Sequence, residues 1–114
     1  MPPEHKKFLF DMQRSAILIT QFIAGKSVSD FKQDQLLRSA VYYQFTIIGE
    51  ALSQLRAIDS GIEQRISETP RIIGFRNQVI HGYGKIGDEI TWRIIQTKLP
   101  ILINELTALL AQDA

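Results

Sequence analysis

Arg76 and His81 are the two side chains of this chain best suited to chemistry on a charged molecule. An imidazole with an ordinary pKa of about 6.5 can accept or donate a proton near neutral pH. A guanidinium can bind a phosphate through two parallel hydrogen bonds and stabilise developing negative charge. Asn77 lies one helical turn before His81, where it can orient the imidazole, and Tyr83 follows closely. These four residues predict a site for proton transfer on an anion.

The segment that carries these residues has the pattern of a short helix from Pro70 to His81. Thr69 can cap its start, proline suits its first turn, and Gly82 suits its exit. One arc of this helix is apolar and consists of Ile72, Ile73, Phe75, Val79 and Ile80. At about 100° per residue, Arg76 lies near the middle of that arc. A guanidinium on an apolar face is costly unless a carboxylate, a phosphate or a polar surface of another chain meets it.

Two kinds of partner for Arg76 are open. Glu50, on the preceding long helix, is an internal carboxylate that could pair with it. The other partner is a phosphate, but Arg76 and His81 are rotated by about 140° on one helix, so one copy cannot easily aim both at one group. A two-fold dimer could do so, because it would bring two copies of the helix to a shared groove.

Composition narrows the class of protein. The 114 residues suit one small domain, and 45% apolar with 22% charged residues is typical of a globular protein. With 13 Lys and Arg against 12 Asp and Glu, a nucleic acid would have to bind a local cluster. The absence of cysteine excludes disulfides and thiolate metal sites, and we expect no cofactor. No signal peptide is evident and the longest apolar runs are far too short to cross a bilayer, so we expect a cytoplasmic protein without membrane contact.

The spacing of apolar residues predicts an all-α protein, a bundle of four or five helices. The first helix should run from about Glu4 to Ala24. The second should begin at a cap, Ser29 or Asp30, and continue to about Ala57. No segment alternates convincingly between apolar and polar residues, so we expect no strand.

Two shorter patterns complete the expected bundle. Ser60 and Glu63 have the spacing of a capping box and predict a turn of helix through Ile66. Asp88 should cap the last helix, and Pro100 should kink it. The core side of this last helix should consist of Ile95, Leu99, Leu102, Leu106 and Leu109.

The second helix has an apolar arc wider than half its circumference. The arc contains Leu36, Leu37, Ala40, Val41, Phe45, Ile47, Ile48, Ala51, Leu52 and Leu55. So broad an arc indicates burial on two sides, against the chain's own core and against a partner. Gly49 interrupts this helix at a cost of about 1 kcal/mol relative to alanine, which is usually accepted where helices approach closely.

Taken together, these motifs resemble a known family. Arg-Asn-x-x-x-His-Gly-Tyr from Arg76 to Tyr83, with Ile48-Gly49-Glu50-Ala51 upstream and Trp92-Arg93-Ile94-Ile95 near the end, resembles the HEPN superfamily and within it the HepT-like toxins. The resemblance covers essentially the whole chain, residues 1–114, as a single helical domain. One departure lies at Arg71-Ile72-Ile73, where these proteins often have a tryptophan after the proline turn. We expect the tryptophan of those proteins to serve packing.

The resemblance implies a metal-independent endoribonuclease toxin of a type VII-like toxin–antitoxin system. It implies a two-fold homodimer with the active groove at the interface and RNA as the substrate. Whether such dimers assemble further with an antitoxin is left open by the resemblance. Arg76 and His81 would be the catalytic pair, and Asn77 would support them. The implied partner is a minimal nucleotidyltransferase antitoxin, which in such pairs can transfer AMP onto a tyrosine; by position this would be Tyr83.

Other interpretations are kept beside this one. HEPN proteins also occur as non-catalytic nucleotide-binding or scaffold subunits of nucleotidyltransferase complexes, and a plain structural dimer is a third reading. A histidine near a helix end, such as His81, is often only a cap or a surface residue, and Tyr83 could simply pack against its loop. His5 lies in a terminus that we expect to fray, so no role is assigned to it.

Overall fold

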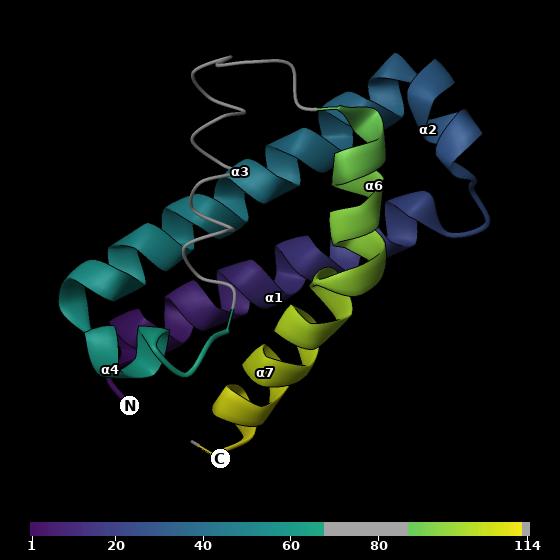
Figure 1. The fold of residues 1–114 in the computed structure, drawn as a ribbon. Helices are drawn as coiled ribbons and strands as arrows, with labels where there is room; N and C mark the ends of the chain where they lie inside the picture. Colours follow the sequence, from purple (N-terminus) through teal and green to yellow (C-terminus); the bar gives the residue numbers. More distant parts are fainter. Residues whose placement is uncertain (68–86, 113–114) are drawn as a thin grey trace.

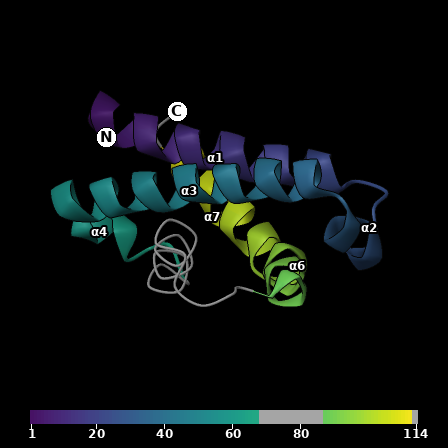
Figure 2. The same ribbon diagram turned by 90° about the horizontal axis from the view of Figure 1, so that it is seen from above.

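The computed structural model describes residues 1–67 and 87–112, and all regular structure in these two ranges is helical (Figure 1). The predicted all-α class is therefore confirmed. The two longest helices, α1 (Pro3–Ile23) and α3 (Gln35–Ile58), run antiparallel to each other. α1 contacts both α3 and the last helix, α7 (Leu99–Ala111). Seen from above, α1 and α3 run alongside each other, and α6 (Asp88–Thr97) extends to one side of the pair (Figure 2).

The first helix matches its predicted limits to within one residue at each end. Pro3 lies in the first turn of α1, where its missing N–H breaks no helical hydrogen bond. After the helix the chain turns at Gly25, whose φ of 73° is a conformation that glycine adopts readily. The expectation that His5 lies in a frayed terminus is wrong. His5 is half-buried on α1, and its Nδ1 lies 3.1 Å from Oδ2 of Asp59, although without the geometry of a hydrogen bond.

The predicted second helix is in fact two helices, α2 (Val28–Gln33) and α3. The cap of α2 is Ser27, two or three residues earlier than expected. Its hydroxyl accepts from the Asp30 N–H at 3.1 Å, and the Asp30 carboxylate accepts from the Ser27 N–H at 2.9 Å, which is a complete capping box. The chain then breaks at Asp34, whose carboxylate accepts from the Leu37 N–H at 3.0 Å and so starts α3 afresh.

A second correction concerns the cap of α4 (Ser60–Glu63). The capping residue is Asp59 instead of Ser60, because Oδ1 of Asp59 accepts from the Ile62 N–H at 3.1 Å. The other oxygen of Asp59 faces His5, so the same carboxylate starts α4 and contacts α1. Local spacing could not distinguish two adjacent capping residues, and the contact with His5 favours the aspartate.

The last predicted helix is bent as expected. α6 and α7 meet at Lys98 with an angle of 41°, and Pro100 lies in the first turn of α7. Asp88 does not cap α6 as predicted; it is the first residue of the helix, and Gly87 precedes it without a side-chain cap. In the described ranges no single helix is long and apolar enough to span a membrane, whereas α6 and α7 pass such a test only when taken together across their bend.

The core lies where α1, α3 and α7 meet. All five residues of the predicted stripe on the last helix are buried. They pack in one cluster with α1 and α3, whose least exposed members are Leu9, Met12, Ala16, Ile19, Val41, Ile48, Leu52 and Leu55. An aromatic group extends this core beneath α2: the Phe31 ring lies 5.6 Å from Trp92 and 6.3 Å from Tyr42, centroid to centroid.

Candidate functional site

The predicted site residues Arg76, Asn77, His81 and Tyr83 lie outside the residues that the structure describes, as does the predicted helix from Pro70 to His81. What the structure provides is the frame on either side of residues 68–86. That frame shows which elements hold the two ends of the segment, and it was not evident from the sequence.

The first end is held by a carboxylate on α7. The Ser67 N–H donates to Oε2 of Glu105 at 3.0 Å and to Oε1 at 3.3 Å, and the Ser67 hydroxyl donates to Oε1 at 2.9 Å. Nearby, Arg65 donates to Oε1 of Gln112 at 2.7 Å. Hydrogen bonds to an ionised acceptor are stronger than neutral ones, so Glu105 ties this end of the segment firmly to α7.

The second end is held by Tyr42 on α3. Its hydroxyl lies 3.0 Å from Oγ1 of Thr91 and donates to Oδ1 of Asp88 at 3.4 Å. Thr91 is fully buried, and its hydroxyl also reaches the Gly87 carbonyl at 3.4 Å. Burial raises the pKa of the Tyr42 phenol above its usual 10.0, and the negative charge of Asp88 acts in the same direction. The phenol therefore stays protonated and can donate to Asp88.

An ion pair supports the same corner of the molecule. Lys32 of α2 pairs with Glu89 in the first turn of α6, and its hydrogen bond lowers the pKa of the Glu89 carboxyl. Arg38 of α3 donates to the carbonyls of Phe31 and Lys32 at the end of α2. These contacts hold α2, α3 and α6 together where residue 87 re-enters the bundle.

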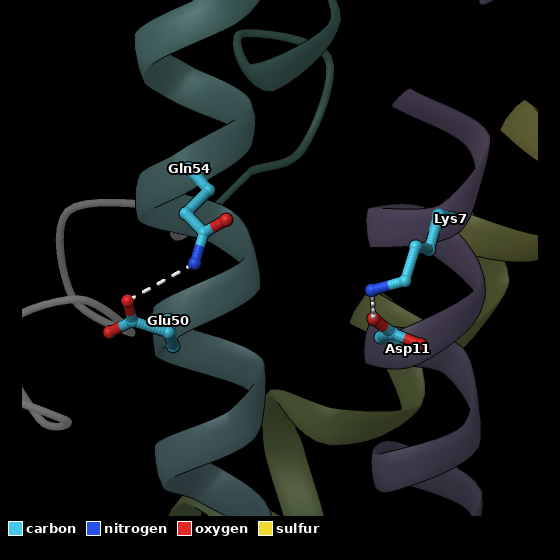
Figure 3. Close-up of polar contacts among 4 residues, drawn as sticks. All are labelled: Lys7, Asp11, Glu50 and Gln54. Atoms are coloured by element: carbon cyan, nitrogen blue, oxygen red, sulfur yellow. Dashed lines mark hydrogen bonds and ion pairs between the residues drawn. The ribbon is translucent and has the colours of Figure 1, made fainter. Parts of the chain in front are cut away.

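Glu50, the expected internal partner of Arg76, is half-buried on α3. Its Oε1 accepts from Nε2 of Gln54 at 3.2 Å, and Figure 3 shows its carboxylate turned away from α1, where Lys7 and Asp11 form their own ion pair at 3.3 Å. Because Arg76 lies outside the described residues, a pairing between Glu50 and Arg76 stays a prediction.

Sequence reasoning missed Tyr42 and Glu105 as residues that frame the site. Tyr42 offers one usable signal, a hydroxyl beside the apolar arc of α3, which needs a polar partner when it is partly buried. Glu105 offers none, because it occupies an ordinary polar position on α7. As for metal ions, residues 1–67 and 87–112 contain no group of three or more His, Asp or Glu side chains placed to bind one.

Comparisons with known proteins address the family directly. The profile described as "Ribonuclease HepT-like" matches residues 12–109. The chain is 29% identical over 102 residues to "Putative RNase MJ1380" of Methanocaldococcus jannaschii, with 88% of this chain and 91% of that protein covered. It is 27% identical over 104 residues to "Probable ribonuclease HepT" of Thermococcus cleftensis, with 90% and 92% covered. No solved structure matches the chain significantly.

The matched range contains the whole motif from Arg76 to Tyr83 as well as the residues that frame it, Tyr42, Ser67 and Glu105. The helical bundle agrees with the fold that the HEPN resemblance implies. The chain belongs to the HepT-like ribonuclease family.

Proposed function

We propose that this protein is a metal-independent endoribonuclease that acts as the toxin of a toxin–antitoxin pair in the cytoplasm. The observation that carries the proposal is the family match over residues 12–109, which includes the Arg76–His81 pair. Residues 1–114 would form one domain, and two copies would share one groove. The two kinds of side chain needed for cleavage without a metal are present in the motif.

The proposed chemistry begins at the ribose. A base removes the proton of the 2′-hydroxyl, the 2′-oxygen attacks the neighbouring phosphorus, and the 5′-oxygen of the next nucleotide leaves and takes up a proton. An imidazole such as that of His81 can accept or donate a proton near neutral pH and so could serve either transfer. Arg76 would bind the phosphate oxygens and stabilise the charge that grows on them during the attack. Asn77 would orient the imidazole of His81.

The proposal for regulation concerns Tyr83. A minimal nucleotidyltransferase encoded beside the toxin would transfer AMP from ATP onto its hydroxyl and release pyrophosphate. The added group brings bulk and a negative charge to the edge of the groove. RNA would then be repelled by the same electrostatic effect that phosphorylation exerts on anionic ligands.

The catalytic assignment is tested by cleavage of RNA in the presence of EDTA. Wild type should cleave, and His81→Ala and Arg76→Ala should each lose at least about 100-fold in rate, the usual scale of a missing acid–base or charge-stabilising group. Arg93→Ala is the matched control, since Arg93 is an exposed arginine on α6 and should keep full activity.

Cleavage that survives His81→Ala would remove His81 from the mechanism. A wild-type protein that is inert on RNA but binds the neighbouring nucleotidyltransferase tightly would contradict the enzyme and favour the binding-subunit interpretation.

The regulatory assignment is tested by intact mass after incubation with the neighbouring nucleotidyltransferase and ATP. Wild type should gain one or more AMP units and lose cleavage activity, whereas Tyr83→Phe should gain none. Tyr43→Phe, which removes an exposed hydroxyl on α3, is the control and should be modified like wild type. A mass gain retained in Tyr83→Phe would place the modification elsewhere.

A further inference from the structure

A hollow between the two long helices has no part in the cleavage chemistry proposed above. It measures about 340 Å³, near the lower end of the range of sites for small molecules. Among its lining residues are Asp11 and Arg14 of α1 and Tyr43, Gln44 and Ile47 of α3. Four of these five side chains carry polar groups. The hollow therefore suits a ligand that forms hydrogen bonds along one edge.

Two of the lining residues offer oxygen acceptors. Oε1 of Gln44 is buried and has no hydrogen-bond partner among the described residues. A buried oxygen without a partner is costly, so a ligand that donates a hydrogen bond to it is favoured. The Asp11 carboxylate, on the side of α1 toward α3 in Figure 3, is the second acceptor. Its Oδ2 pairs with Lys7 at 3.3 Å, an exposed and therefore weak ion pair, and Oδ1 has no partner in residues 1–67 and 87–112.

Arg14 and Tyr43 add a cation and an aromatic ring to the hollow. Arg14 is exposed on α1, about one turn after Asp11, and its guanidinium forms no ion pair with another described residue. Tyr43 is 64% exposed, which leaves its ring accessible. Exposed aromatic rings beside cations commonly bind single-stranded nucleic acid, because any base can stack on them. The hollow thus combines a stacking surface, one cation and two acceptors.

We propose that this hollow binds a guanine base of the RNA substrate. The Watson–Crick edge of guanine has an acceptor, O6, followed by two adjacent donors, N1–H and the N2 amino group. These two donors match the oxygens of Asp11 and Gln44. The guanidinium of Arg14 donates to O6, and the base stacks on the ring of Tyr43.

The other three bases match the hollow less well. Adenine and cytosine each have a ring nitrogen acceptor where guanine has N1–H, so this nitrogen would face an oxygen of Asp11 or Gln44. Uracil has a ring N–H, but it is flanked by two acceptors. Each of these bases would leave an oxygen of the hollow without a donor, and an unmade hydrogen bond of a buried group is costly.

The hollow lies close to one end of the frame around the candidate site. Tyr43 follows Tyr42, which binds Asp88 and Thr91, and the two tyrosines lie about 100° apart around α3. The two flanks of α3 are therefore separated by no more than the diameter of a helix, about 10–12 Å. A short RNA strand that crosses α3 can reach both the hollow and Gly87. The inference rests on the proposed function, because it assigns a base preference to the same RNA substrate.

The base preference is tested by binding of short 2′-O-methyl RNAs, which lack the free 2′-hydroxyl that cleavage requires. The strands are UUGUUU and its copies with adenine, cytosine, uracil or hypoxanthine in place of guanine. Wild type should bind the guanine strand at least about 10-fold more tightly than the adenine, cytosine and uracil strands, the scale of one paired base contact. The hypoxanthine strand, which lacks only the N2 amino group, should have an intermediate affinity. Equal affinity for all strands, or preference for another base, would overturn the proposal.

Substitutions of the two acceptors test whether the hollow causes the preference. Asp11→Asn replaces one oxygen by a donor, and Gln44→Met removes the buried oxygen at similar size. Each should reduce the preference for guanine over adenine to less than about 3-fold. Glu4→Gln is the matched control, because it removes an exposed carboxylate from the same helix and should keep the full preference. A preference that survives both acceptor substitutions, or that Glu4→Gln also abolishes, would contradict the assignment.

Substitutions of Tyr43 test the stacking contact. Tyr43→Ala should weaken binding of every strand by about 10-fold, because stacking contributes for any base. Tyr43→Phe keeps the ring and should bind like wild type. Binding unchanged in Tyr43→Ala would overturn the stacking contact.

Two further measurements separate this proposal from its neighbours. GMP, a free nucleotide with the same base, should compete about 100-fold more weakly than the guanine strand, because it lacks the flanking phosphates. Equal competition by GMP would overturn the assignment to RNA. Guanine-selective binding by a protein that cleaves no unmodified RNA would contradict the ribonuclease and leave the base site intact. Cleavage of RNA by a protein with no base preference in binding would contradict the base site alone.

Discussion

At the scale of single residues, the frame around the candidate site depends on a few hydrogen bonds between side chains that lie far apart in the sequence. Tyr42 reaches Asp88 across 46 positions of sequence, and Ser67 reaches Glu105 across 38. The type and spacing of Arg76, Asn77, His81 and Tyr83 indicate chemistry because those residues lie in one short segment. Pairings across such long separations leave no periodic trace, which is why the partners of Tyr42 and Ser67 could not be predicted.

Removing the Tyr42 hydroxyl tests this frame. Tyr42→Phe should lower the free energy of unfolding by about 1 kcal/mol, the usual net value of a partly buried hydrogen bond, as measured by urea titration at fixed protein concentration. Thr97→Ala, at an exposed threonine at the end of α6, should change it by less than about 0.5 kcal/mol. Equal effects of the two substitutions would mean that Tyr42 does not hold α6.

The raised pKa of Tyr42 gives the same residue a pH signature. A phenol whose pKa is higher in the folded than in the unfolded protein contributes stability that is complete below its unfolded pKa and is lost as the pH rises through the folded value. Unfolding measured above pH 10 should therefore show a loss of stability that is smaller in Tyr42→Phe. An identical alkaline decline in both proteins would contradict this assignment.

At the scale of elements, apolar periodicity predicts the long helices well and their breaks poorly. The stripe of α3 continues the apolar spacing of α2 closely enough to hide the break at Asp34. The break is set by the Asp34 carboxylate, which accepts a hydrogen bond from the backbone N–H of Leu37. In the sequence, one capping residue is a weaker signal than the apolar periodicity of ten residues. The bend near Pro100 was predictable, because proline removes a backbone donor wherever it occurs in a helix.

The capping box of α2 makes a testable prediction at this scale. The pKa of the Asp30 carboxyl is lowered below the usual 3.8, mainly by its hydrogen bond with the Ser27 N–H and to a lesser extent by the Ser27 side chain. This contribution to stability is present above the unfolded pKa and is lost as the pH falls through the lower folded value. In an NMR titration, Ser27→Ala should raise the midpoint of Asp30 partway toward 3.8, because the backbone donor remains. Ser29→Ala, whose hydroxyl bonds Gln33 instead, should leave that midpoint unchanged.

At the scale of the whole molecule, the broad apolar arc on the second predicted helix indicated burial on two sides, and the structure accounts for one of them. Leu37, Val41 and Ile48 are buried in the chain's own core, while Leu36 and Tyr43 face outward. A single sequence shows how much apolar surface a helix carries but not which part of it a chain covers by itself. The division becomes visible only when the core is assembled, and it leaves Leu36 and Tyr43 on the outer surface of α3.

The hydrogen bonds between Ser67 and Glu105 give α7 two structural roles. The leucines of α7 pack in the centre of the bundle, and its Glu105 binds Ser67, before the segment that carries the motif. Across the bend, Thr91 of α6 binds Gly87, after that segment. Substitutions in this C-terminal arm therefore cannot be judged by packing alone. A change that merely tilts α6 and α7 would leave the hydrophobic interior in place and still shift Ser67 and Gly87, the two ends between which the candidate site residues lie.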